Sequence, residues 1–229
     1  MSAKKLAIFD IDGTIFRSSL LIEITEALIT EKIFPEKVRD IYNKDYENWS
    51  NRKDSYEKYI EAVVNAFVQN IKGVRYNDFT KVAKKVITSH KNRIYRYTRE
   101  LVKDLKKKKY YLLAISNSPK AVVDEFCKKW GFNKAYGRVY ELDKSGKFTG
   151  KILYEKLISD KAKILKRAIK KEHLTITDSV GVGDSESDIA FLKLVKKPIC
   201  FNPNSKLYQH AKLAKWKIII ERKDVIYYL

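Results

Sequence analysis

The chain has 229 residues, of which 48 are Lys or Arg and 28 are Asp or Glu, so its formal net charge is +20. Hydrophobic residues make up 45% of the chain and charged residues 33%, a balance typical of a folded soluble protein, which excludes a disordered chain, a fibre and a small disulfide scaffold. At about 150 residues per domain, the length predicts one large domain or one domain with an insertion.

The first predicted element is a short apolar strand at residues 6–9, which ends at Asp10. The segment from 17 to 95 that follows contains one glycine, Gly73, and one proline. Few glycines favour helices, because each interior glycine costs a helix about 1 kcal/mol relative to alanine. Apolar side chains also recur at helical spacing, over residues 20–28, 38–42, 56–67 and 79–86. We therefore predict a helical module over 17–95, inserted after the first strand.

After residue 95 the pattern changes to short apolar runs with helices between them. The runs do not alternate with polar residues, which is typical of parallel strands buried on both faces; they cover residues 110–115, 180–182, 199–201 and 217–220. Helices are expected over residues 119–130, 160–171, 186–195 and 205–214, and a β-hairpin over 137–150. Strands that alternate with helices predict a doubly wound, Rossmann-like parallel α/β sheet. The expected α/β core is residues 1–16 and 96–229.

The sequence also predicts the compartment. Cys127 and Cys200 form no CxxC pair, so we expect buried, reduced thiols. The four apolar residues at 6–9 are too few for a signal peptide, and runs such as 218–220 are too short to span a bilayer. These features predict a cytoplasmic protein without a membrane partner.

The excess of positive charge consists mainly of lysine, with 38 Lys against 10 Arg. Proteins that read nucleic-acid sequence rely on Arg for bidentate base contacts, so the lysine excess favours a solvated surface, and nucleic acid is the less favoured partner. The helical module over 17–95 holds 15 basic and 11 acidic residues, a net charge of +4, so +16 belongs to the core.

Polar residues follow the predicted strands at the points where the strands end. They are Asp10, Asp12, Gly13 and Thr14 after the first strand, Ser116 and Asn117 after the second, and Gly183, Asp184, Ser185 and Asp188 after a later one, with Lys161 opening an intervening helix. In an open parallel sheet the ligand site lies beyond the carboxyl ends of the strands. Four carboxylates in one crevice repel one another unless a cation lies between them, and hard oxygen ligands that leave room for water and phosphate favour Mg²⁺.

Each of these residues also has a structural explanation when taken alone. Asp12 can belong to an Asp-Gly turn, and Lys161 can be one of many surface lysines. Ser116 can cap the helix expected at residue 119, although Ser118 is better placed to do so.

Together, the motifs resemble those of the haloacid dehalogenase superfamily of phosphohydrolases. Four segments carry the resemblance, in the superfamily's order: Asp10-Ile11-Asp12-Gly13-Thr14, Ile115-Ser116-Asn117-Ser118, Lys161, and Gly183-Asp184-Ser185-Glu186-Ser187-Asp188. The helical module is similar to the type-one cap of that superfamily. The hairpin ending at Gly150, and Phe201-Asn202-Pro203 with Trp216, look most like the phosphoserine-phosphatase-like branch.

The resemblance implies a reaction. Asp10 would attack phosphorus and form an aspartyl-phosphate, and Asp12 would protonate the leaving alkoxide and then take a proton from water. Mg²⁺ would be held by Asp10, the backbone carbonyl of Asp12, and Asp184, with Asp188 binding or orienting from the same loop.

The remaining motif residues would bind the phosphoryl group. Ser116 and Lys161 would hold its oxygens and offset their charge, together with Asn117. Gly13 and Thr14 would let backbone amides approach the phosphate closely.

The resemblance leaves the substrate open. An Asp at position 12 points to a phosphomonoesterase, and a small phosphorylated metabolite such as phosphoserine is the first expectation. However, Ser19 stands where phosphoserine phosphatases place a substrate-reading Glu, and Ser185 and Ser187 replace their usual Gly and Asn.

Two other functions remain as alternatives. The +20 charge could attract polynucleotide ends or lipid phosphates as substrates. A function of another class is a non-catalytic nucleic-acid-binding protein on a phosphatase scaffold, which predicts salt-sensitive binding. Arg17, Glu23, Trp49 and Arg52 are candidates for reading the leaving group, and each also has a structural explanation.

Overall fold

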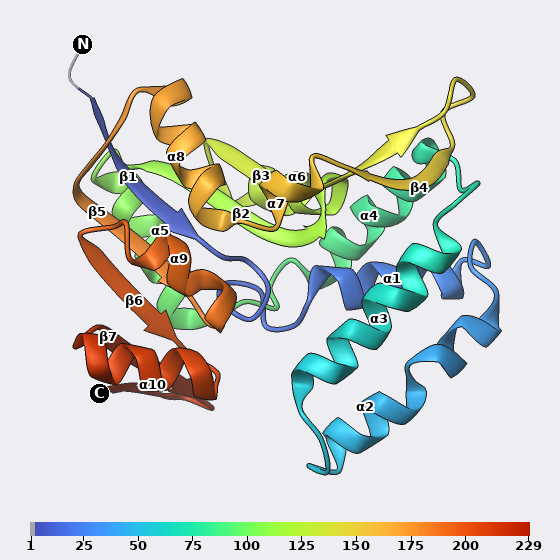
Figure 1. Ribbon diagram of the computed structural model, residues 1–229, viewed down its shortest axis with the longest axis horizontal. Helices are drawn as coiled ribbons and strands as arrows, with labels where there is room; N and C mark the ends of the chain where they lie inside the picture. The colour runs from blue at the N-terminus through green and yellow to red at the C-terminus, as the bar shows by residue number, and fades with distance from the viewer. Residues whose placement is uncertain (1–2) are drawn as a thin grey trace. The chain divides into compact units, whose positions relative to one another are not determined.

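The computed structural model describes residues 3–229 and divides the chain into two compact units (Figure 1). The first unit, called the core unit below, contains the chain up to Ser19 together with Lys91–Arg138 and Tyr154–Leu229. The second, the helical unit, contains Leu20–His90 and Val139–Leu153. The insertion expected at 17–95 differs from the helical unit at both ends, and it lacks the second segment.

The strands form one sheet in the order β4-β3-β2-β1-β5-β6-β7-β8. Their bounds are β1 (Lys4–Phe9), β2 (Tyr111–Pro119), β3 (Lys134–Leu142), β4 (Phe148–Leu153), β5 (Leu174–Gly183), β6 (Lys197–Phe201), β7 (Lys217–Arg222) and β8 (Val225–Tyr228). The five pairings from β3 to β7 are parallel, and β3–β4 and β7–β8 are antiparallel. The second half of β3 pairs with β4 in the helical unit. The predicted α/β class with a mostly parallel sheet is confirmed.

Helices of the core unit lie on both faces of its sheet. Their bounds are α5 (Arg96–Lys107), α6 (Lys120–Trp130), α7 (Glu155–Ile158), α8 (Lys161–Glu172), the 3₁₀ helix η2 (Glu186–Asp188), α9 (Ile189–Leu192) and α10 (Ser205–Ala214). Leu6 and Ile8 of β1 share one apolar cluster with α8, α9 and α10. The neighbouring Phe9 points to the other face, where its ring meets Phe132 just after α6 at 5.8 Å. Because β1 is covered on both faces, its apolar run does not alternate with polar residues.

The helical unit is built from α1 (Leu20–Thr30), the 3₁₀ helix η1 (Glu36–Ile41), α2 (Asn43–Ser50), α3 (Tyr56–Asn70) and α4 (Tyr76–His90). The predicted apolar stripe of α1 is buried, with Leu20, Ile24 and Leu28 all fully enclosed. Phe79 and Val82 of α4 are buried as the spacing predicts. α2 contributes no buried residue.

The β-hairpin formed by the end of β3 and β4 belongs with the helices of this second unit. Phe148 exchanges backbone hydrogen bonds with the turn between α3 and α4: Gly73 donates to its carbonyl at 2.8 Å, and its own N–H donates to Val74 at 2.9 Å. Its ring lies 5.4 Å from Phe79 in an edge contact. The order along the chain predicts that this hairpin belongs to the core, because sequence order does not reveal these pairings.

Two elements differ from the sequence-based expectation. The helix expected over 186–195 is two short pieces, η2 and α9, and the edge strand β8 was not anticipated. Cys127 and Cys200 are buried free thiols, as predicted.

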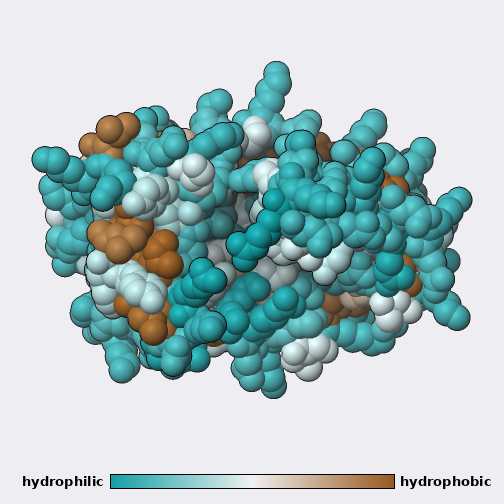
Figure 2. Space-filling view, turned by 90° about the horizontal axis from the view of Figure 1, so that it is seen from below, coloured by the Kyte–Doolittle hydropathy of each residue, from teal (hydrophilic) through white to brown (hydrophobic). Residues whose placement is uncertain are grey.

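The face of the molecule in Figure 2 is mostly hydrophilic, with small separate hydrophobic patches. Among residues 3–229, no helix combines the length and the apolar composition that crossing a membrane requires.

Candidate active site

The candidate site of the core unit lies where three neighbouring strands end. β1 lies between β2 and β5, and the three strands are parallel, so their carboxyl ends meet at one edge of the sheet. Asp10 follows β1 directly and Asp184 follows β5, while Ser116 lies near the end of β2. The fold therefore brings together residues that are more than 170 positions apart in the chain.

Three carboxylates and one ammonium group form the centre of this site. One oxygen from each of Asp10, Asp184 and Asp188 lies within 4.8 Å of the others. The Lys161 Nζ donates to Asp10 Oδ1 at 2.6 Å and to Asp188 Oδ1 at 2.5 Å. Asp10 and Lys161 are 5% and 4% exposed, and Asp188 is not exposed at all. When all four groups are ionised, the cluster carries a net negative charge in a buried place.

The pKa values of these groups reflect the same excess of negative charge. Burial raises the pKa of Asp10 well above its usual range, although Lys161 acts to lower it. Burial and repulsion from Asp10 and Asp188 raise the pKa of Asp184. Burial alone would lower the pKa of Lys161, but the Asp10 and Asp188 carboxylates outweigh it and hold that pKa above its usual range. A hard divalent cation among the carboxylates would relieve this repulsion, and their oxygen atoms are ligands that Mg²⁺ prefers.

Asp188 is held in place by its own loop. Its Oδ2 accepts hydrogen bonds from the backbone N–H groups of Asp184 at 2.9 Å and Ser185 at 3.1 Å. A Cβ atom at Gly183 would meet the Asp188 Cβ and Oδ2 at 2.5 Å, so only glycine allows this approach. The loop therefore fixes Asp188 while its other oxygen contacts Lys161.

Asp12 is bound by two hydroxyl groups from the end of β2. Ser116 Oγ donates to Asp12 Oδ2 at 2.5 Å, and Ser118 Oγ donates to the same oxygen at 3.0 Å. The role of Ser118 was missed in the sequence, where it was interpreted as a helix cap. That interpretation was wrong: α6 begins at Lys120, and its N-cap residue is Pro119, which makes no side-chain capping bond. The Ser-x-Ser spacing, which places both hydroxyls on one side of the strand end, was the available signal.

Gly13 and Thr14 pack against Asp184. Gly13 has φ +78°, and a Cβ atom there would meet Asp184 Oδ2 at 2.2 Å. The Gly13 N–H donates to the carbonyls of Phe16 and Ser18, at 3.0 and 3.1 Å. The Thr14 hydroxyl donates to Asp184 Oδ1 at 3.3 Å. Both residues thus contact the Asp184 carboxylate and help to position it. Their contact with phosphate stays a prediction.

A buried hydroxyl that the sequence did not indicate supports the segment of Gly13 and Thr14. Thr98 of α5 is fully buried and donates its hydroxyl hydrogen bond to the carbonyl of Thr14 at 3.0 Å. Asn117, in contrast, is exposed beside Ser116. All the predicted site residues therefore lie at one edge of the sheet, and their roles in binding phosphate stay predictions.

The four candidates for reading a leaving group are dispersed. The Arg17 guanidinium of the core unit lies 5.8 Å from the ring centroid of Tyr95. Glu23 lines one cavity of the helical unit. Trp49 and Arg52 line a different one.

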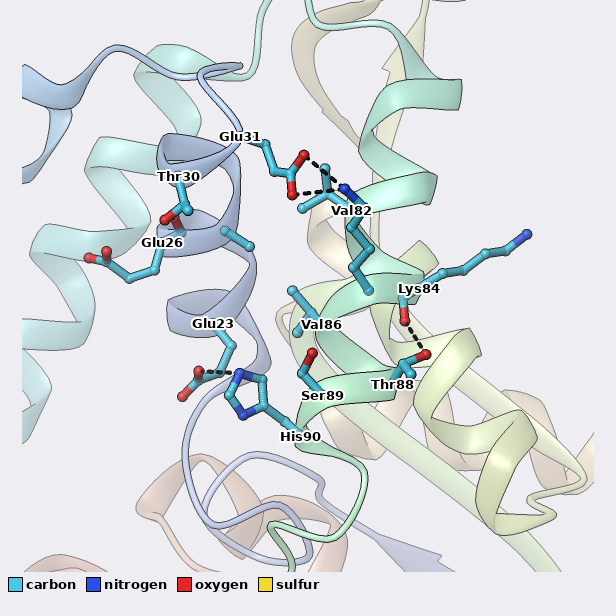
Figure 3. Close-up of a pocket in the computed structure, with 12 residues that line it drawn as sticks. Glu23, Glu26, Thr30, Glu31, Val82, Lys84, Val86, Thr88, Ser89 and His90 are labelled. Atoms are coloured by element: carbon cyan, nitrogen blue, oxygen red, sulfur yellow. Dashed lines mark hydrogen bonds and ion pairs between the residues drawn. The ribbon is translucent and has the colours of Figure 1, made fainter.

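The cavity that contains Glu23 lies between α1 and α4 and has a volume of about 620 Å³ (Figure 3). Its acidic side chains have basic partners. Glu23 pairs with His90 at 3.3 Å, and Glu31 pairs with Lys85 at 2.9 Å, as the dashed lines in Figure 3 mark. Glu26 pairs with Arg39 at 3.0 Å. Glu26 and Glu31 thus have cationic partners, and Glu23 has an imidazole partner.

Comparisons with known proteins agree with the geometry of the core unit. A family model of the haloacid dehalogenase-like hydrolases matches residues 7–193. The chain is 26% identical over 223 residues to the phosphoserine phosphatase of Methanocaldococcus jannaschii, covering 97% of this chain and 94% of that protein. It is 23% identical over 225 residues to the histidinol-phosphatase of Neisseria meningitidis serogroup C, covering 94% and 98%. A solved complex of phosphoserine phosphatase with its substrate matches with a TM-score of 0.64 at 25% identity, covering 98% of this chain and 96% of that one.

Proposed function

The chain belongs to the haloacid dehalogenase-like hydrolases and is a phosphatase of that family, and on this premise we propose that it hydrolyses small phosphomonoesters with Asp10 as the nucleophile. The observation that carries this proposal is the cluster at the strand ends, in which Asp10 lies beside Lys161 at 2.6 Å and Asp12 lies beside Ser116. A nucleophile and a separate proton carrier are the two groups that a two-step phosphoryl transfer needs.

In the first step, a carboxylate oxygen of Asp10 forms a bond to phosphorus while the bond between phosphorus and the ester oxygen breaks. Asp12 gives its proton to the departing alkoxide. Because Ser116 and Ser118 both donate to Oδ2 of Asp12, we assign the transferable proton to Oδ1. The products of this step are the alcohol and an aspartyl-phosphate.

In the second step, water attacks phosphorus and the bond from phosphorus to Asp10 breaks. Asp12 takes the proton that the water loses, which restores its starting state, and inorganic phosphate leaves. The Lys161 ammonium, which already contacts Asp10, offsets the charge of the phosphoryl oxygens, and the Ser116 hydroxyl, which contacts Asp12, joins it.

The residues that would hold Mg²⁺ are Asp10, Asp184 and Asp188, together with the backbone carbonyl of Asp12. The donor set fits this ion, because three carboxylates, of which those of Asp10 and Asp188 are buried and that of Asp184 is half-buried, lie within 4.8 Å and a single ammonium group balances them only in part. When bound, the ion supplies positive charge next to the phosphoryl oxygens.

The test of the nucleophile is the Asp10→Asn variant. An amide cannot attack phosphorus, so phosphate release should fall by about 1,000-fold or more. The matched control is Asp178→Asn, which changes a surface aspartate paired with Lys5 in the same way and should leave phosphate release unchanged. Circular dichroism and melting temperature establish that both variants fold. If Asp10→Asn kept its activity, the mechanism would be wrong.

The metal site has its own test. Mg²⁺ binds only the folded protein, so at about 100 times its Kd it should raise the free energy of unfolding by about 2.7 kcal/mol. Asp184→Asn removes one charged ligand and should abolish most of that gain. Thermal unfolding of both proteins, with and without Mg²⁺, measures the difference. An equal gain in wild type and variant would place the ion elsewhere.

A substrate panel identifies the leaving group. It contains O-phosphoserine, histidinol phosphate, sugar phosphates, nucleotides, 3′-phosphorylated oligonucleotides and lipid phosphates. Ser19 is buried. It stands where the resemblance to phosphoserine phosphatases would place a substrate-reading Glu. We therefore expect the preference for O-phosphoserine over other small phosphomonoesters to be modest.

A further inference from the structure

Five aromatic side chains form a cluster at one end of the helical unit. They are Tyr42, which directly follows η1, Tyr46 and Trp49 of α2, and Tyr56 and Tyr59 of α3. Trp49 stacks on Tyr59 at 5.4 Å with an angle of 12° between the ring planes. Tyr46 and Tyr56 lie 6.0 and 5.3 Å from Trp49. The rings thus attach α2 to α3.

Three of these rings are left partly in solvent. Tyr59 is 6% exposed and belongs to the hydrophobic core, but Tyr46 is 45% exposed and Trp49 and Tyr56 are each 38% exposed. The helical spacing in the sequence placed Tyr56 in a buried stripe, and the structure corrects that expectation. Trp49 contacts Tyr46, Tyr56 and Tyr59, and its 38% exposure leaves part of the ring available to a ligand. Exposed aromatic groups gathered in one place mark interaction sites more often than chance.

The exposed rings line a hollow of about 700 Å³ together with one positive charge. Arg52 lies in this lining, and its guanidinium makes no hydrogen bond or ion pair with any residue from 3 to 229 that the structure records. Asp54, the acidic residue of the lining, is already bound by the Lys58 Nζ at 2.6 Å. The hollow therefore combines flat apolar surfaces with an uncompensated cation.

Charge and shape together select the occupant. A quaternary ammonium group suits an aromatic cage, but here it would lie near the like charge of Arg52. A purely apolar group would leave the guanidinium without a partner. A planar ring that carries a phosphate satisfies both features, because the ring can stack on Trp49 while the phosphate accepts hydrogen bonds from Arg52. We propose that this hollow of the helical unit is a nucleotide site, which binds a nucleobase on Trp49 and Tyr46 and its phosphate on Arg52.

The site uses none of the residues around Asp10, so it is independent of the proposed phosphatase reaction. The same chemistry occurs in a free mononucleotide and in a single-stranded polynucleotide. A cavity of this volume lies within the range of small-molecule sites.

The experiment follows tryptophan fluorescence of the full chain as ligand is added. The protein carries Asp10→Asn so that nucleotides are not hydrolysed, and Trp49→Phe shows how much of the signal belongs to Trp49. The ligands are adenosine monophosphate, adenosine, inorganic phosphate and a short oligothymidylate. We expect adenosine monophosphate to quench Trp49 and to bind more tightly than adenosine, and phosphate alone to leave the signal unchanged.

Matched variants separate this site from general electrostatic attraction. Arg52→Gln should weaken the binding of adenosine monophosphate about tenfold and leave the binding of adenosine unchanged. Lys53→Gln removes the same charge from the adjacent residue, which is outside the lining, and should weaken binding about twofold at most. Tyr46→Leu should weaken the binding of both adenosine monophosphate and adenosine about fivefold or more. Tyr208→Leu, which changes an exposed tyrosine of α10, should change the binding of neither ligand.

Three results would overturn the proposal. They are the absence of quenching by any nucleotide, equal weakening by Arg52→Gln and Lys53→Gln, and full binding in Tyr46→Leu. If Tyr46→Leu failed to fold, the comparison of Arg52→Gln with Lys53→Gln would still decide, because both side chains are exposed. Tighter binding of oligothymidylate than of adenosine monophosphate would support the proposal with a polynucleotide as the source, and the reverse order would support it with a free nucleotide.

Discussion

Asp12 illustrates how a neighbouring side chain, that of Ser118, can support the proposed chemistry. Its Oδ2 accepts hydrogen bonds from two serines, and Ser118, the second of them, is 2% exposed. The Ser118 N–H donates in turn to Ser116 Oγ at 2.9 Å, so the three residues form one network. A proton carrier held in this way keeps its orientation through both steps of the reaction.

Ser118→Ala should therefore slow the reaction without removing it. The loss of one hydrogen bond to a charged group lowers kcat by about 10- to 100-fold, while KM changes by about twofold or less, because Ser118 contacts Asp12 and not the substrate. Steady-state kinetics measure both constants, and Ser118→Thr, which keeps the hydroxyl, should restore most of kcat. The control is Ser145→Ala, which removes an exposed hydroxyl that donates to Asp143 at 2.8 Å. An unchanged kcat in Ser118→Ala would limit Ser118 to a structural role.

At this scale the sequence predicted the residues of the site better than their contacts. Asp10 and Asp184 could be placed together because each follows a strand of one parallel sheet. The bonds of Ser118 and Thr98 could not be predicted, because they depend on how β2 and α5 approach the loop after β1. Pairings between distant segments leave no periodic signal in the chain.

Among the helices, α8 shows how a terminus positions a functional group. Asp160 is its N-cap, and its side chain accepts a hydrogen bond from the Lys163 N–H at 3.0 Å. Lys161 is the first residue of the helix and turns its ammonium group into the carboxylate cluster. The cap thus fixes the first turn, from which Lys161 reaches Asp10.

Asp160→Ala should lower the free energy of unfolding by about 1 kcal/mol near neutral pH. Hydrogen bonding to the Lys163 N–H holds the pKa of Asp160 below its usual range. A lowered pKa gives stability that is present above the unfolded-state pKa and is lost as the pH falls through the folded-state value. The difference between wild type and variant should therefore shrink at about pH 3. Urea unfolding at both pH values measures it.

The matched control for this cap is Asp104→Ala. It removes an exposed carboxylate paired with Lys108 at 2.8 Å within α5, and it should cost about 0.5 kcal/mol or less. A cost as large as that of Asp160→Ala would mean that the cap adds nothing beyond a surface charge pair.

Helices and strands with a strong hydrophobic periodicity were predicted well. Strands whose position depends on pairing with a distant segment were predicted poorly. The stripe of α1 and the apolar run of β1 identified these elements without the structure. The association of β4 with the helices depends on Phe148 and its bonds to Gly73 and Val74. The strand β8 has alternation too short to recognise, and it exists because it pairs with β7.

For the molecule as a whole, the dominant feature is its charge of +20. Like charges on one folded chain repel one another. Among the acidic groups of the candidate site, Asp10 and Asp188 are buried. Many lysines pair with a neighbouring acid, as Lys108 does with Asp104, but exposed pairs contribute little to stability.

Salt should therefore stabilise this protein. Raising sodium chloride from about 20 to about 200 mM shortens the range of repulsion, and we expect the melting temperature to rise by about 2–4 °C. Differential scanning calorimetry in a buffer without divalent ions or phosphate measures the change. A melting temperature that fell with added salt would show that specific ion pairs outweigh the general repulsion.

The position of β1 in the sheet has a consequence for how the chain is made. Leu6 of β1 pairs with Tyr111, and Ala7 pairs with Val180, so the central strand is synthesised first but obtains its second neighbour last. At about 5–20 residues per second, roughly 10–35 s separate the appearance of β1 on the ribosome from that of β5. During this interval one edge of β1, whose residues 6–9 are apolar, has no partner strand. An unpaired edge of this kind can pair with strands of other chains, so β1 is a segment of the nascent chain that is prone to aggregation until translation reaches β5.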